Sequence, residues 1–187
     1  MLFFNGSTAT AFIIFGTIFG LHLFTSAHKI NAKILKYMGL NILFATWCYS
    51  GYMVDFFSVI IWGENVPNTN GWIGIIGGMW LAIALIFAVY VGAELFFPNY
   101  KVRFTSIFIV IAIIFEFFLF FETNSSLGFI YPTTERALIN FYVNFYTPLG
   151  IIVIFYYLTL FFLLAMGFLY KSLQTKNNPN DKIAGAV

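Results

Sequence analysis

Long runs of apolar residues dominate the chain, and short polar stretches separate them. About 20 apolar residues suffice for an α-helix to cross a bilayer, and five runs are about that long or longer. The pattern therefore predicts an all-α fold, an integral membrane helical bundle that forms one transmembrane domain over residues 1–187. The predicted spans are residues 8–27, 37–62, 72–97, 104–122 and 148–170, and residues 171–187 form a polar tail.

The region between the fourth and fifth spans has a mixed pattern. Residues 123–147 begin with turn-forming residues, which indicate a loop, and continue into the apolar piece 137–146. That piece fits an interfacial helix, a re-entrant element, or the first turns of a long fifth helix kinked at Pro148. Asn140 and Asn144 are four residues apart, so a helix would place them on one face.

Lysine and arginine residues gather in alternate polar stretches. The loops 28–37 and 98–103 and the tail carry eight of them, and Arg136 is alone on the opposite side. Because cytoplasmic loops carry an excess of these residues, the bias predicts an N-terminus outside and a C-terminus in the cytoplasm. We therefore expect a multi-pass protein of the cell membrane whose main partner is the lipid bilayer.

The composition narrows the function classes. The 187 residues are 61% hydrophobic and 9% charged, whereas soluble domains have about 25% charged residues. The net charge of +2 and the lack of a basic stripe argue against nucleic acid. Cys48 is the single cysteine, so a Cys-based metal motif is not expected. With no recognisable catalytic motif, we expect no enzyme activity, no metal and no cofactor.

Two carboxylates lie within predicted spans and are candidates for a polar site in the membrane. With a rise of 1.5 Å per residue, Asp55 and Glu116 both lie roughly 10 Å below the outer boundary. Arg136 lies just outside and could extend toward either acid. An acid in hydrocarbon costs roughly 2.5–3.5 kcal/mol at the centre of a span. Simpler alternatives stay open, because Asp55 fits a water interface and Glu116 fits a protonated carboxyl hydrogen-bonded to another helix.

A second set of polar residues falls near the predicted inner side. His22, Asn41 and Glu94 lie at a similar depth, roughly 5–8 Å in from the boundary. Together with the outer acids they suggest a relay across the membrane. Each also has a structural alternative, since His22 fits a packing residue, Asn41 an interhelical hydrogen bond and Glu94 a headgroup contact.

Two pairs of glycines four residues apart predict close contacts between helices. They are Gly16 with Gly20 in the first span and Gly74 with Gly78 in the third. Small residues at this spacing allow helix backbones to approach closely. The spacing does not distinguish a contact within the chain from a homo-oligomer or an assembly with other membrane subunits.

The layout also resembles a group of membrane proteins. The stretches that carry the resemblance are KYMGLNILFATW after the basic loop, IVIAIIFEFFLFF in the fourth span and AMGFLYKSLQTKNNPNDKI at the end of the fifth. They are similar to uncharacterised archaeal-type polytopic membrane proteins, which in turn look like multi-span sensor regions ahead of signalling domains. The resemblance implies a non-catalytic sensory or interaction module. In that group two further spans usually follow the fifth, so this sequence is either truncated before them or a shorter relative. The alternative is a small transporter or a subunit that conducts protons or cations.

Overall fold

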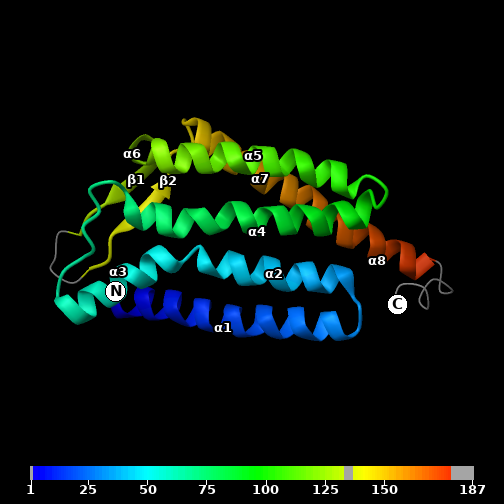
Figure 1. Cartoon of the computed structure of the whole chain (residues 1–187), viewed down its shortest axis with the longest axis horizontal. Helices are drawn as coiled ribbons and strands as arrows, with labels where there is room; N and C mark the ends of the chain where they lie inside the picture. The colour runs from blue at the N-terminus through cyan, green and yellow to red at the C-terminus, as the bar shows by residue number, and fades with distance from the viewer. Residues whose placement is uncertain (1, 133–136, 178–187) are drawn as a thin grey trace.

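The structure is a computed structural model that describes residues 2–132 and 137–177, and within these ranges it is mostly helical (Figure 1). Four of its helices are long and apolar enough to cross a membrane, or five if one bent pair counts as a single span. This confirms the helical fold. The elements are α1 (Leu2–Lys29), α2 (Lys33–Trp47), α3 (Ser50–Trp62), α4 (Trp72–Phe96), α5 (Lys101–Phe121), α6 (Thr123–Ser126), β1 (Leu127–Ile130), β2 (Asn140–Val143), α7 (Pro148–Leu160), the π-helix η1 (Phe161–Met166) and α8 (Gly167–Asn177).

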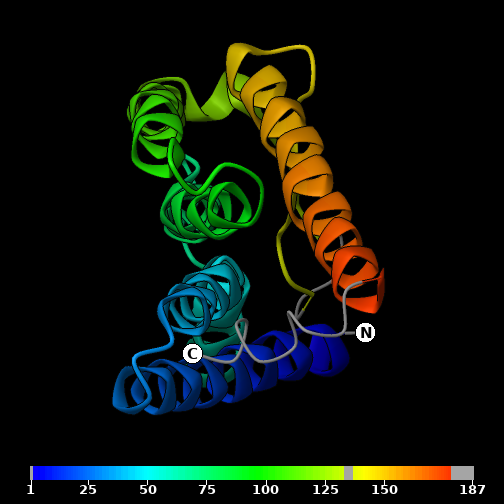
Figure 2. The same ribbon diagram turned by 90° about the vertical axis from the view of Figure 1, so that its right-hand side faces the viewer.

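The long helices lie side by side, with α4 at the centre. Figure 1 shows α1, α2, α4 and α5 in that order, and the end view of Figure 2 shows α7 and α8 running along another side of the bundle. Helix α4 contacts α2, α3, α5, α7, η1 and α8. In the most apolar 18-residue stretch of α4, 50% is buried, whereas the corresponding share in α1 is 17%. An apolar helix with little burial fits a lipid-facing position.

Two ends of the bundle have different chemistry. One end holds the start of α1, helix α3 and the strands β1 and β2, and we call it the hairpin end (Figure 1). The other holds the turns before α2 and before α5, with Lys29, Lys33, Lys101 and Arg103, and we call it the basic end. The two turns that carry these residues thus lie at the same end of the bundle.

The second predicted span is not one continuous helix. It is divided into α2 and α3, which meet at an angle of 41°. Kinks are common at Gly/Ser pairs, and here Ser50 and Gly51 follow the break. The Ser50 hydroxyl donates to the Ile76 carbonyl at 2.8 Å, and a side chain at Gly51 would overlap the Ile73 carbonyl. The chain therefore bends where its backbone packs against α4.

The region 123–147 contains strands where the sequence suggested a helix. β1 pairs antiparallel with β2, from Leu127 opposite Val143 to Ile130 opposite Asn140. The helical interpretations of residues 137–146 are therefore wrong. Aromatic side chains suit a strand, and Phe141 of β2 stacks on Tyr52 of α3 with ring centroids 4.9 Å apart. Tertiary contact with α3 thus determines this element.

The two glycine pairs face different kinds of neighbour. Gly16 and Gly20 lie at the contact between α1 and α2, and a Cβ at Gly20 would lie 2.9 Å from the carbonyl oxygen of Gly39. This contact is within the chain. The neighbours of Gly74 and Gly78 are different, because Gly74 faces Leu127 of β1 and Gly78 faces Leu119 of α5.

Candidate functional site

The Asp55 carboxylate joins three parts of the hairpin end. Asp55 is fully buried, and its Oδ2 accepts hydrogen bonds from the Asn65 side-chain amide at 3.0 Å and the Ile139 backbone N–H at 2.8 Å. Its Oδ1 accepts from the Val66 N–H at 3.0 Å. The Asn65 amide also donates to the Ala137 carbonyl at 2.8 Å. We call this set the Asp55 clamp.

The clamp explains how an acid is accommodated in an apolar helix. Hydrogen bonds to a charged acceptor contribute about 1.5–3 kcal/mol each, so three of them offset much of the cost of burying the carboxylate. They also fix residues 137–139 against α3. Asp55 therefore has a positioning role at this end, and the simple alternative of a water-exposed acid does not apply.

A pocket of about 450 Å³ lies next to the clamp. This is within the range of small-molecule sites. Its wall comes from the first turns of α1, from the break between α2 and α3, and from the chain before and at the start of β2. The lining residues are Asn5, Thr8, Ala9, Phe12, Tyr49, Tyr52, Ala137, Leu138, Ile139 and Asn140. None of these described residues is charged.

Aromatic rings and one hydrogen bond order the pocket wall. The ring of Phe12 meets that of Tyr49 edge to face, with centroids 5.0 Å apart. The Tyr52 hydroxyl donates to Oδ1 of Asn140 at 2.8 Å. Because this bond occupies the amide oxygen, the Asn140 NH₂ is the part left to donate to a ligand. Sequence reasoning missed Asn140, Tyr49 and Tyr52 as pocket residues, since they come from distant segments.

Glu116 does not share a site with Asp55. It lies on α5 within electrostatic range of Tyr156 on α7, and its Oε2 is buried without a hydrogen-bond partner in the described part of the chain. The Tyr156 hydroxyl donates to the Phe108 carbonyl at 3.2 Å. The three donors to Asp55 leave no role for Glu116 in the clamp. Arg136, the third residue of the predicted polar site, lies outside the described residues.

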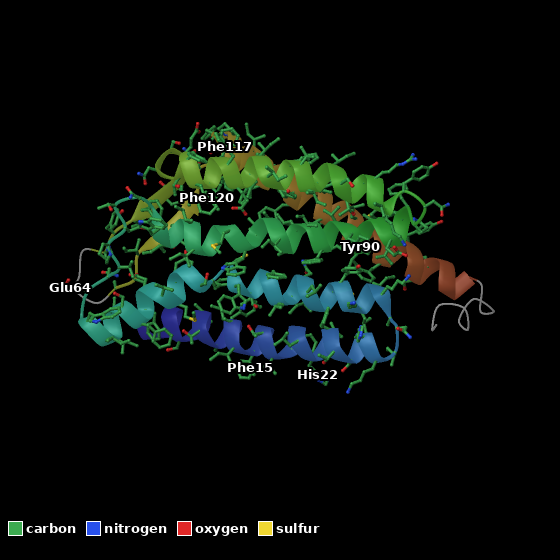
Figure 3. The ribbon with its side chains drawn as sticks, viewed as in Figure 1. Phe15, His22, Glu64, Tyr90, Phe117 and Phe120 are labelled. Atoms are coloured by element: carbon green, nitrogen blue, oxygen red, sulfur yellow. The ribbon has the colours of Figure 1, made fainter. Side chains whose placement is uncertain are left out.

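The three residues of the predicted inner layer lie apart. His22 is exposed and points away from the bundle, as Phe15 does (Figure 3). The Asn41 amide donates to the Ala84 carbonyl at 2.7 Å and so joins α2 to α4. Glu94 forms an ion pair with Lys101 at 2.6 Å. Asn41 thus makes the interhelical hydrogen bond given as its alternative, whereas His22 is not packed between helices and Glu94 pairs with a lysine. The three residues do not form a continuous relay.

Within residues 2–132 and 137–177, no group of three His, Cys, Asp or Glu side chains lies close enough together to hold a metal ion.

Comparison with known proteins gives no assignment: no family model, no curated protein and no solved structure matches this chain.

Proposed function

We propose that the chain is a multi-pass protein of the cell membrane, with its N-terminus outside and its C-terminus in the cytoplasm. Its function would be non-catalytic recognition of a small apolar molecule in the pocket at the hairpin end. The four or five apolar helices support a location in the membrane. The lysine and arginine residues at the basic end support this orientation. The hairpin end would then face outward.

One observation carries the sensory part of the proposal. Tyr49 lines the pocket and also lies in the break between α2 and α3, where its N–H bonds to the Thr46 carbonyl at 3.2 Å. A ligand that contacts Tyr49 acts directly on the bend. Helix α2 continues from this point to the basic end, so a change of bend would be transmitted toward the cytoplasmic side. A ligand shifts the bend only as far as it binds one geometry better than the other.

The test measures the bend with the pocket open and filled. Nitroxide labels at exposed Leu35 and Ile61 would report the α2–α3 distance in a Cys48→Ala background. The variant Ala9→Trp places an indole in the pocket. The matched control Ala165→Trp adds an indole at an exposed position of η1, away from the pocket. We expect a resolved shift of the label distance for Ala9→Trp alone. Equal distances in all three proteins would contradict a sensory role.

Glu116 supports the second candidate, a proton- or cation-conducting subunit. The Oε2 of Glu116 is buried without a hydrogen-bond partner among the described residues, which is unusual for a buried polar atom. Intramembrane acids often mark ion pathways. Proton flux into liposomes that contain the protein would be compared with Glu116→Gln. Unchanged flux in the variant would remove this candidate, whereas loss of flux would favour it over recognition.

A further inference from the structure

The pocket wall formed by α1 changes from polar to apolar along the helix. Asn5, Thr8 and Phe12 lie on three successive turns of α1 and all line it. From Asn5 to Phe12 the helix rises about 10 Å. A molecule along this wall would therefore have a polar group near the end of the bundle and an apolar part beside Phe12.

Two uncharged donors of the pocket wall remain for a ligand, beside the Asn5 amide, which can both donate and accept. The Asn140 NH₂ and the Tyr49 hydroxyl make no hydrogen bond within residues 2–132 and 137–177, whereas the Asn140 oxygen is held by Tyr52. A charged ligand group would find no countercharge among the described lining residues, and burying an unpaired charge is costly. An uncharged acceptor fits these donors.

We propose that the pocket binds an uncharged lipophilic molecule that carries a carbonyl oxygen, and this rests on the recognition function proposed above. The carbonyl accepts hydrogen bonds from Asn140 and Tyr49, and the apolar part lies along α1 between Ala9 and Phe12. The same chemistry occurs in the ester of a membrane glycerolipid and in a lipophilic quinone. The clamp at Asp55 supports the site by holding Ile139, next to Asn140, in the pocket wall.

The experiment compares two probes that differ only in the carbonyl. The protein would be placed in bilayer discs of ether-linked phospholipids, which contain no ester carbonyl, and titrated with radiolabelled 1-acylglycerol or 1-alkylglycerol of equal chain length. We expect the acyl compound to bind about fivefold to 150-fold more tightly, as for two net hydrogen bonds. A benzoquinone with a decyl chain is then added as competitor. If it displaces the acyl probe more effectively than unlabelled 1-acylglycerol does, the result indicates a quinone as the source; if less effectively, it indicates a glycerolipid ester.

Three variants make the result specific. Asn140→Leu and Tyr49→Phe should each reduce the preference for the acyl compound while retaining the binding of 1-alkylglycerol, which also reports an intact pocket. Tyr100→Phe removes a hydroxyl from an exposed residue of the basic end and should keep the full preference.

The outcomes separate this inference from the function on which it rests. Equal affinities for the two glycerols in the wild-type protein overturn the carbonyl assignment and leave recognition of apolar molecules standing. If neither glycerol nor the quinone binds, the carbonyl assignment is also overturned, and the α2–α3 distance measurement then decides the proposed function independently. A preference that survives both Asn140→Leu and Tyr49→Phe overturns the assignment of these donors.

Discussion

Replacing Asp55 by asparagine tests the clamp with the smallest change of shape. The substitution removes the charge and turns one oxygen into an NH₂ group. The orientation that preserves most contacts keeps the remaining oxygen at the Oδ2 position, where it still accepts from Asn65 and Ile139. The new NH₂ then faces the Val66 N–H, which loses its acceptor.

The expected cost follows from these three bonds. One hydrogen bond to a charged acceptor is lost, at about 2 kcal/mol, and two are weakened by about 0.5–1 kcal/mol each as their acceptor becomes neutral. We therefore expect Asp55→Asn to lower the free energy of unfolding by about 3–4 kcal/mol. Asp55→Ala loses all three bonds and leaves the buried Ile139 N–H without an acceptor, so its cost should be higher, about 5 kcal/mol.

Reversible unfolding in mixed detergent micelles, followed by circular dichroism, measures both variants. Glu64→Gln is the matched control, because Glu64 is exposed just after α3 (Figure 3) and undergoes the same chemical change. Its cost should stay within about 0.5 kcal/mol. If Asp55→Asn were equally mild, the clamp would not hold this end together and the argument for its role would fail.

Two further substitutions test helix packing. Gly39→Leu should destabilise the protein by about 1–3 kcal/mol, because a Cβ there would lie 2.7 Å from the Phe24 backbone nitrogen. The control Leu35→Phe, at an exposed position of the same helix, should be nearly neutral. Ser50→Ala should cost about 1 kcal/mol through loss of the bond to Ile76, whereas Ser106→Ala should be mild because that exposed hydroxyl bonds only within its own helix. Denaturation midpoints check both pairs, and equal effects within a pair would refute the packing argument.

The helices could be predicted because their signal is local. Runs of apolar residues gave α1, α4, α5 and the α7–α8 segment, with ends within a few residues except at the start of α1 and the end of α8. The break after Trp47 was missed because it depends on the approach of Gly51 to Ile73 on another helix. Strands of four residues, such as β1 and β2, carry little periodicity of their own, and their pairing depends on long-range contacts.

The candidate site could be predicted only in part. Asp55 stood out as an acid in an apolar run, but its donors Asn65 and Ile139 are 10 and 84 residues away in sequence. Depth counting along a helix gave Asp55 a level in the membrane but no information on which helix face it occupies. For the same reason it grouped His22 with Asn41, although His22 points away from the bundle (Figure 3).

The most direct test of the central claim, a membrane protein with the pocket end outside, uses single cysteines on either side of α5. In a Cys48→Ala background, Asn124→Cys lies exposed at the hairpin end and Asn99→Cys lies exposed at the basic end. A membrane-impermeant maleimide applied to intact cells should label Asn124→Cys and reach Asn99→Cys only after permeabilisation. The opposite pattern, or equal labelling of both in intact cells, would contradict the account.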